Sequence, residues 1–120
     1  MGPTVLIVDD HPGFRRMARR MLEEGGFHVV AEAVDAAGAL AAVHEHRPQL
    51  VLLDIQLPDL DGFAVAEALV VGANSPVVVL TSSRSASDYG SRIGRSPARG
   101  FVPKAELSGP VLADLFQAAG

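Results

Sequence analysis

The 120-residue chain contains no cysteine and no tryptophan, and Lys104 is its only lysine. Without cysteine, neither a disulfide framework nor a thiolate metal site can form, and the composition fits the reducing cytoplasm. No apolar run reaches the ~18 residues of a membrane span, so we expect a chain that does not cross a membrane. No secretory signal is evident before the first apolar run, which also favours a cytoplasmic location. The net charge of −4 argues against direct binding of nucleic acid by this chain.

What the sequence does contain is enough apolar side chain, 48% of residues, to build one domain over 1–120, and no second domain is expected. Short apolar runs bounded by turn residues predict buried strands, at residues 4–9, 27–33, 50–54, 77–81 and 100–103. Helical patterns separate these strands, around residues 14–22 and at 36–46, 63–71, 86–93 and 110–118. The alternation predicts an α/β protein with a parallel sheet, right-handed crossovers and helices on both faces.

Three local details of the helices are predicted as well. The Ala-rich helix at 36–46 is expected to turn one apolar face to the core, formed by Ala37, Leu40, Ala41 and His44. Asp61 is expected to cap the helix that starts at residue 63. The Ser-, Arg- and Gly-rich stretch 82–99 is expected to hold only one short helix, at 86–93.

Polar side chains follow four of the predicted strands, at the point where each strand ends. They are Asp9 with Asp10, then Asp54, Thr81 and Lys104. Because the carboxyl ends of parallel strands meet at one edge, and open α/β sheets bind ligands there, we expect these groups to share a crevice. Three carboxylates, a hydroxyl and an ammonium can hold a divalent metal and receive a phosphoryl group.

Four segments in this order resemble the receiver domain of bacterial two-component response regulators. They are VLIVDDHPGFRR, LVLLDIQLPDLDG, VVVLTSS and GFVPK. The DDHP start, the LVLLD…LP…DG block and the EL after Lys104 look most like the LuxR-type (NarL-like) branch. The resemblance implies a flavodoxin-like (CheY-like) three-layer sandwich around a five-stranded parallel sheet with strand order 2-1-3-4-5.

The resemblance also implies a metal site and a phosphoacceptor. Asp54 is implied as the residue that takes the phosphoryl group, and Mg²⁺ as the cofactor. Asp10 and Asp54 are implied as direct ligands, Asp9 as a residue acting mainly through water, and the main-chain carbonyl of Gln56 as a further ligand. Mg²⁺ relieves the repulsion of crowded carboxylates and shields the charge of the incoming phosphoryl group.

Three further residues receive roles from the resemblance. Lys104 is implied as the cation on the phosphate side, Thr81 as the switch hydroxyl and Phe101 as the aromatic switch position. Phe101 has no hydroxyl, so any switch there works by packing alone. Pro103 precedes Lys104 where many relatives carry a proline after the lysine, and Ala105 therefore argues against a cis bond at that place.

Residues beside these positions carry weaker signals. We interpret His11 as a partly exposed histidine at a helix start, with a metal or proton role as the alternative. The arginines at 15, 16, 19 and 20 are interpreted as a solvated helix face, with kinase docking as the alternative. Ser82 is small enough to leave room for a phosphodonor, and Gln56 and Ser83 stand where relatives tune the lifetime of the phosphoryl group.

The function expected from these residues is that of a phosphorelay receiver in a two-component system. A sensor histidine kinase would donate its phosphoryl group to Asp54, and a partner-binding face would then switch. The chain would be no enzyme beyond catalysing its own phosphoryl transfer and hydrolysis. The alternative is a receiver-like interaction module that works without phosphorylation. A Mg²⁺-dependent phosphatase is disfavoured because the first strand ends in Asp9-Asp10-His11 rather than Asp-x-Asp.

The resemblance names partners of two kinds besides the kinase. LuxR-type relatives carry a helix-turn-helix DNA-binding domain after the receiver, and residues 1–120 include none. We therefore expect the output to come from a partner protein or from a DNA-binding domain outside this chain. A homodimer is a further possibility, and regulation of transcription is the process implied.

Overall fold

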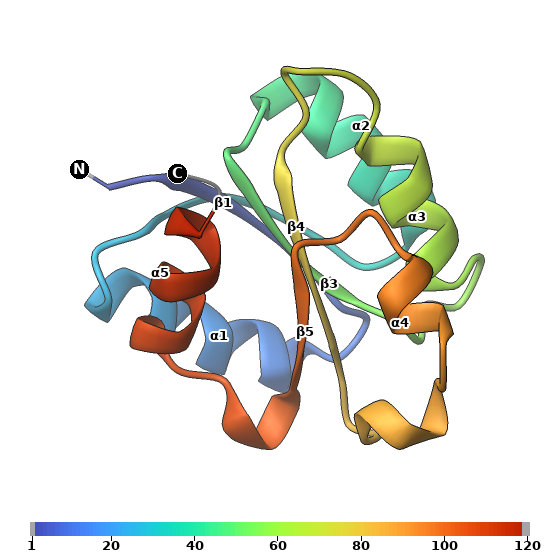
Figure 1. Cartoon of the computed structure of the whole chain (residues 1–120). Coiled ribbons are helices and arrows are strands. Elements are labelled where there is room, and N and C mark those ends of the chain that lie inside the picture. The colour runs from blue at the N-terminus through green and yellow to red at the C-terminus, as the bar shows by residue number, and fades with distance from the viewer. Residues whose placement is uncertain (1, 119–120) are drawn as a thin grey trace.

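A computed structural model of the chain describes residues 2–118 and shows one parallel sheet covered on both faces (Figure 1). The strand order is β2-β1-β3-β4-β5, which confirms the predicted fold class and topology. The strands are β1 Thr4–Val8, β2 His28–Ala33, β3 Leu50–Asp54, β4 Val77–Ser82 and β5 Gly100–Pro103. None of the helices between residues 2 and 118 combines the length and the hydrophobicity that a membrane crossing needs.

The helices divide between the two faces of the sheet. Figure 1 shows α1 and α5 on one side and α2, α3 and α4 on the other. Their bounds are α1 Pro12–Glu24, α2 Ala36–His46, α3 Gly62–Leu69, α4 Arg92–Arg95 and α5 Gly109–Gln117. Two short 3₁₀ turns complete the fold, η1 Ala86–Asp88 and η2 Lys104–Glu106.

The core consists of two apolar layers, one on each face of the sheet. Along β3, Leu50 and Leu52 face the layer that contains Ala18, Leu22 and Leu112 of α1 and α5. Val51 and Leu53 alternate with them and face the layer beneath α2 and α3. Because both faces of β3 are covered, all five of its residues are buried, as its continuous apolar run predicts.

The predicted inner face of α2 is wrong. Leu40 is 39% exposed, and Ala37, Ala41 and His44 are exposed as well. The helix instead turns a neighbouring stripe to the sheet, formed by Ala36, Ala39, Ala42 and Val43.

Two aspartates fix the orientation of α2 at its first turn. Asp35 caps the helix by accepting a hydrogen bond from the Gly38 amide at 2.7 Å, and Asp59 accepts bonds from the amides of Ala36 and Ala37 at 2.8 and 3.1 Å. Since this Ala-rich helix is apolar on several sides, its periodicity alone does not select the buried face.

The predicted helix at 86–93 is also wrong, because two shorter turns replace it. The first is η1, where the Asp88 carboxylate accepts a hydrogen bond from the Ser85 amide at 3.1 Å. Gly90 then adopts a left-handed conformation with φ of 58°, which no regular right-handed helix contains. The single-turn helix α4 follows this break.

Gly62, the first residue of α3, lies directly against the end of β3. Its amide donates a hydrogen bond to the carbonyl of Ile55 at 2.7 Å. A Cβ added at this position would lie 2.6 Å from the carbonyl oxygen of Asp54 and 2.7 Å from Cα of Ile55. Both neighbours are backbone atoms, so neither can rotate away, and only glycine allows this approach.

Gly62→Ala is expected to lower the free energy of unfolding by about 1–3 kcal/mol, because the strand end and the helix start must separate. Gly13→Ala is the matched control, since a Cβ there meets no atom within 4 Å. The control should leave stability unchanged or raise it by up to ~1 kcal/mol, as alanine favours a helix over glycine. Denaturant unfolding measures both, and equal effects would contradict the backbone-contact argument.

Candidate functional site

The register of the central strands brings two carboxylates together at one edge of the sheet. β1 pairs with β3 so that Val8 lies opposite Leu53, and the next residue on each chain is an aspartate. Asp9 is fully buried and Asp54 is 2% exposed. Buried carboxylates are costly unless they are paired, and the residues around them show how the cost is met.

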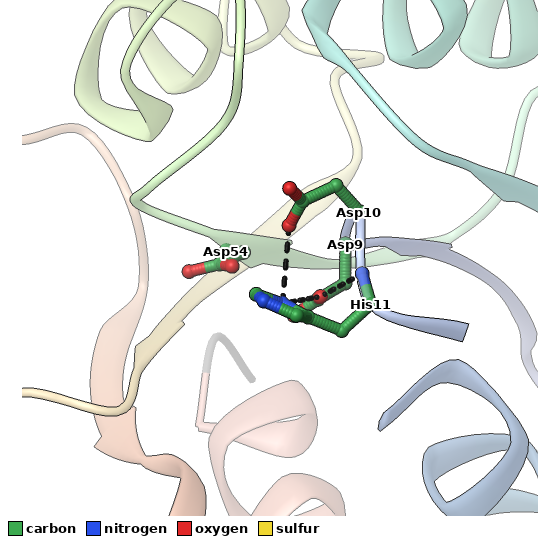
Figure 2. A group of neighbouring side chains, drawn as sticks. All are labelled: Asp9, Asp10, His11 and Asp54. Carbon is green, nitrogen blue, oxygen red and sulfur yellow. Dashed lines mark hydrogen bonds and ion pairs between the residues drawn. The ribbon is translucent and has the colours of Figure 1, made fainter. Parts of the chain in front are cut away.

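Figure 2 shows Asp9, Asp10, His11 and Asp54 as one group at the ends of β1 and β3. Each offers one potential ligand atom, and these atoms all lie within 4.8 Å of one another. The imidazole Nδ1 of His11 lies 3.0 Å from Asp9 Oδ1 and 3.1 Å from Asp10 Oδ1. His11 is exposed at the start of α1, as the sequence suggested, and its ring also belongs to the cluster.

Lys104 supplies the ammonium of the site from η2, just after β5. Its Nζ lies 2.7 Å from Asp9 Oδ2 and 3.5 Å from Asp54 Oδ2. The same Nζ lies 4.3 Å from the ring centre of Phe14 in α1, a cation–π contact that holds the side chain over the acids. One positive charge therefore faces two buried carboxylates.

The two buried aspartates differ in acidity because their partners differ. Burial raises the pKa of Asp54 to about 6, and the charge of Asp9 adds to this, although the Gln56 amide and Lys104 oppose it. Burial also acts to raise the pKa of Asp9, but bonds from Lys104 and from the His11 amide outweigh it and hold that pKa below its ordinary value. Asp9 is therefore the ionised partner of Lys104, and Asp54 takes up a proton first.

Thr81 lies opposite Asp54 in the pairing of β3 with β4, yet its hydroxyl is engaged elsewhere. Thr81 is fully buried, and its Oγ1 donates a 2.7 Å hydrogen bond to the carbonyl of Val102 in β5. Phe101, on the same strand, packs edge-on to Tyr89 with ring centres 6.0 Å apart. Thr81 is thus adjacent to the carboxylate cluster but turned to the neighbouring strand.

The loop after β3 is tied down at several points. The amide of Gln56 donates to Asp54 Oδ1 at 3.1 Å, and Gln56 pairs with Asp61 in an isolated antiparallel bridge. Asp61 caps α3 as predicted, by accepting a bond from the Ala64 amide at 2.9 Å. Asp59 joins the same loop to the first turn of α2. The segment that carries the Gln56 carbonyl is therefore anchored beside Asp54.

Tyr89, the only tyrosine, received no role from the sequence, although it contacts the site's surroundings. Its hydroxyl lies 2.6 Å from Oγ of Ser82, and its ring also packs against Phe63 with ring centres 5.7 Å apart. Ser82 is fully buried. A single tyrosine in the Ser-, Arg- and Gly-rich segment after β4 is the signal that was available.

The arginines of α1 are only partly a solvated face. Arg16 and Arg20 are exposed. Arg15 and Arg19 instead bind the carboxylate of Glu32 at 3.0 and 2.8 Å. Arg15 also donates to the carbonyl of Asp9 at 2.8 Å, so it helps to hold the turn that carries the acidic residues.

The residues present fit a hard divalent cation. Mg²⁺ takes oxygen ligands in octahedral geometry and keeps several waters, so it needs only a few protein oxygens. Asp10, exposed to solvent, and the buried Asp54 offer such oxygens within one cluster. The net negative charge left by one lysine among three carboxylates favours a cation.

The fold and the site together define a doubly wound α/β protein with an acidic site at the carboxyl ends of its strands. The sequence matches the response regulator receiver domain family over residues 5–114, and the chain belongs to that family. It is 41% identical over 103 residues to the transcription regulator BvgA of Bordetella pertussis, covering 85% of this chain and 49% of BvgA.

Two further similarities place the chain within the family. It is 38% identical over 84 residues to a protein-glutamate methylesterase/protein-glutamine glutaminase of Hahella chejuensis, covering 70% of this chain and 24% of that protein. The signal receiver domain of the response regulator NarL from Mycobacterium tuberculosis superposes with a TM-score of 0.83 at 33% identity, covering 97% and 98% of the two chains. The chain spans about half the length of BvgA, or less in the case of the methylesterase. The resemblance to the LuxR-type branch is confirmed.

Asp54→Asn is expected to stabilise the metal-free protein above its pKa of about 6. A raised pKa means that ionisation costs stability as pH rises from the ordinary value of 3.8 through about 6. Removing the charge should therefore raise the free energy of unfolding by on the order of 3 kcal/mol at about pH 8, and by about half as much at about pH 5.

Denaturant unfolding in a chelator at the two pH values measures this difference. Asp114→Asn, at an exposed position of α5, is the control and should show the same small effect at both. A stabilisation by Asp54→Asn that does not change with pH would contradict the electrostatic explanation.

Proposed function

We propose that this chain is a phosphoacceptor receiver that takes a phosphoryl group from the phosphohistidine of a sensor histidine kinase onto Asp54. The observation that supports this most directly is the placement of Asp54 at the end of a central strand, among Asp9, Asp10 and Lys104. In the transfer, an Asp54 oxygen bonds to phosphorus as the phosphorus–nitrogen bond breaks, and the imidazole of the donor leaves with the electron pair of that bond. The product is an acyl phosphate.

The chain's own residues supply position and charge for this step. Near neutral pH Asp54 is mostly ionised, because its pKa is about 6, and is ready to attack. The Lys104 ammonium, 3.5 Å from Asp54 Oδ2, is placed to balance charge on the phosphoryl oxygens. Mg²⁺, when held by Asp10, Asp54 and the Gln56 carbonyl with Asp9 acting through water, neutralises further charge on those oxygens.

Thr81 and Phe101 are proposed to carry the response. The Thr81 hydroxyl leaves the Val102 carbonyl and donates to a phosphoryl oxygen, a charge-assisted bond that exists only after modification. Phe101 and the segment 84–99 then repack. Phosphorylation thereby biases an equilibrium between two conformations, and partners read the changed face.

The domain is proposed to span 1–120, to act in the cytoplasm and to serve regulation of transcription. BvgA is a transcription regulator, so the output would come from a DNA-binding domain outside this chain or from a partner protein. The second candidate is an interaction module that binds partners without phosphorylation. Beryllofluoride, which mimics a phosphoryl group on aspartate, separates the two by binding only to a working acceptor site.

Asp54→Asn is expected to abolish labelling by acetyl phosphate in the presence of Mg²⁺, because the amide cannot form an acyl phosphate. Asp114→Asn keeps every residue of the site and should label as the parent does. Intact-mass measurement detects the added phosphoryl group, and circular dichroism verifies that both variants fold. Undiminished labelling of Asp54→Asn would refute the assignment of the acceptor.

Mg²⁺ is expected to bind with an affinity that falls about tenfold per pH unit below about pH 6, because it competes with the proton on Asp54. Above that pH the affinity should level off. Asp10→Asn should weaken binding at every pH by removing a ligand. Calorimetric titration at several pH values measures this, and a pH-independent affinity would argue that Asp54 is not part of the metal site.

A further inference from the structure

We propose that His11 is an additional metal ligand at this site, and that it makes the site prefer transition-metal dications over Mg²⁺. The inference rests on the proposed function, because it concerns the same carboxylate cluster. Figure 2 shows the imidazole in contact with the carboxylates of both Asp9 and Asp10.

The spacing of the donor atoms is that of ligands on one metal ion. Neighbouring ligands of an octahedral ion with bonds of ~2.1 Å are separated by ~3.0 Å. Nδ1 of His11 lies 3.0 Å from Asp9 Oδ1 and 3.1 Å from Asp10 Oδ1. The nitrogen, which is hydrogen-bonded to Asp9, therefore lies at a spacing from both carboxylates that one metal ion could bridge.

The backbone of His11, and not its ring, makes the hydrogen bonds that shape the start of α1. Its amide donates to Asp9 Oδ1 at 2.8 Å, and its carbonyl accepts the amide of Arg15 at 3.1 Å as the first hydrogen bond of α1. The side chain makes no capping bond and is 68% exposed. Among the described residues, the polar contacts of the ring are those with Asp9 and Asp10. Replacing the ring should therefore leave the domain folded.

A second observation concerns the charge balance of the cluster. Asp54 is 2% exposed, and its Oδ1 accepts the Gln56 amide. Its Oδ2 has Lys104 Nζ as an ionic partner only at 3.5 Å, beyond the 2.7–3.2 Å of an ordinary N–H···O bond. The one ammonium lies closer to Asp9, at 2.7 Å, than to Asp54, at 3.5 Å. The charge of the buried Asp54 carboxylate is therefore only partly balanced, and a metal ion placed between Asp54 and Asp10 would balance it.

The chemistry of the donor set decides which ions gain from His11. Mg²⁺ prefers oxygen, so with Mg²⁺ the imidazole stays a hydrogen-bond donor to the aspartates. Imidazole suits Ni²⁺ and Zn²⁺, and affinity at mixed nitrogen and oxygen sites rises along the series from Mn²⁺ to Cu²⁺. His11 should therefore strengthen the binding of these ions and leave Mg²⁺ almost unaffected. Metal supply would then decide which ion occupies the site.

The test is a calorimetric titration of the whole chain with Ni²⁺ and with Mg²⁺. The exposed histidines at 28, 44 and 46 would first be replaced by glutamine, so that His11 is the last imidazole in the background protein. Ni²⁺ should bind this protein at one site in competition with Mg²⁺. His11→Ala should weaken Ni²⁺ binding by about tenfold or more and change Mg²⁺ binding by less than about twofold.

Asp10→Asn is the matched comparison, since it removes an oxygen ligand and should weaken both ions. A spectroscopic readout is the hyperfine coupling of bound Mn²⁺ to a ligand nitrogen, expected in the background protein and absent in His11→Ala. Equal weakening of Ni²⁺ and Mg²⁺ by His11→Ala would mean that the ring only positions the aspartates, and would overturn the proposal. Unchanged or undetectable Ni²⁺ binding would overturn it as well.

The outcome is separable from that of the proposed function. The ratio of Ni²⁺ to Mg²⁺ affinity involves no phosphoryl transfer, whereas labelling by acetyl phosphate with Mg²⁺ tests Asp54 as the acceptor. A chain that fails to label but keeps a His11-dependent preference for Ni²⁺ would support the metal ligand and remove the receiver chemistry. A chain that is labelled by acetyl phosphate but shows no His11-dependent preference for Ni²⁺ would support the receiver chemistry and refute His11 as a metal ligand.

Discussion

The site depends on one electrostatic constraint, the confinement of two buried carboxylates against a single ammonium. Asp9 and Asp54 follow or end the neighbouring strands β1 and β3, and Lys104 reaches both from the turn after the edge strand β5. Because one positive charge does not satisfy two negative ones at low dielectric, Asp9 stays ionised and Asp54 takes a raised pKa. Three contacts keep these groups in place. The Phe14 ring packs against the Lys104 ammonium, and Arg15 donates a hydrogen bond to the Asp9 carbonyl. Gly62 packs closely against the backbone of Asp54.

Much of this arrangement follows from the sequence by simple rules. Continuous apolar runs mark strands covered on both faces, and parallel strands deliver the residues after them to one edge. That reasoning places Asp9, Asp54 and Lys104 at one edge of the sheet, where the structure brings Lys104 within 3.5 Å of both aspartates. The family resemblance adds the strand order, which no single run of residues contains.

The parts that escaped prediction share a physical cause, since tertiary contacts decide them. The buried side of α2 depends on Asp59, a residue 23 positions away that binds the amide of Ala36, and an Ala-rich helix has no strong periodicity of its own. The break at Gly90 requires a positive φ. Glycine permits this conformation, but its presence in the sequence does not predict it. The direction of the Thr81 hydroxyl depends on β5, because its hydrogen-bond acceptor is the Val102 carbonyl.

The hydrogen bond from the Thr81 hydroxyl to the Val102 carbonyl stabilises the conformation of the unmodified protein. The hydroxyl is fully buried, and its departure would strand a carbonyl acceptor in the interior, at a cost of about 1–3 kcal/mol. A cost of that size corresponds to roughly 5–150-fold in the ratio of the two conformations. If Thr81 acts as the proposed switch, this hydrogen bond would make the unmodified conformation the dominant one and the alternative conformation rare. Low basal output would then depend on one threonine side chain.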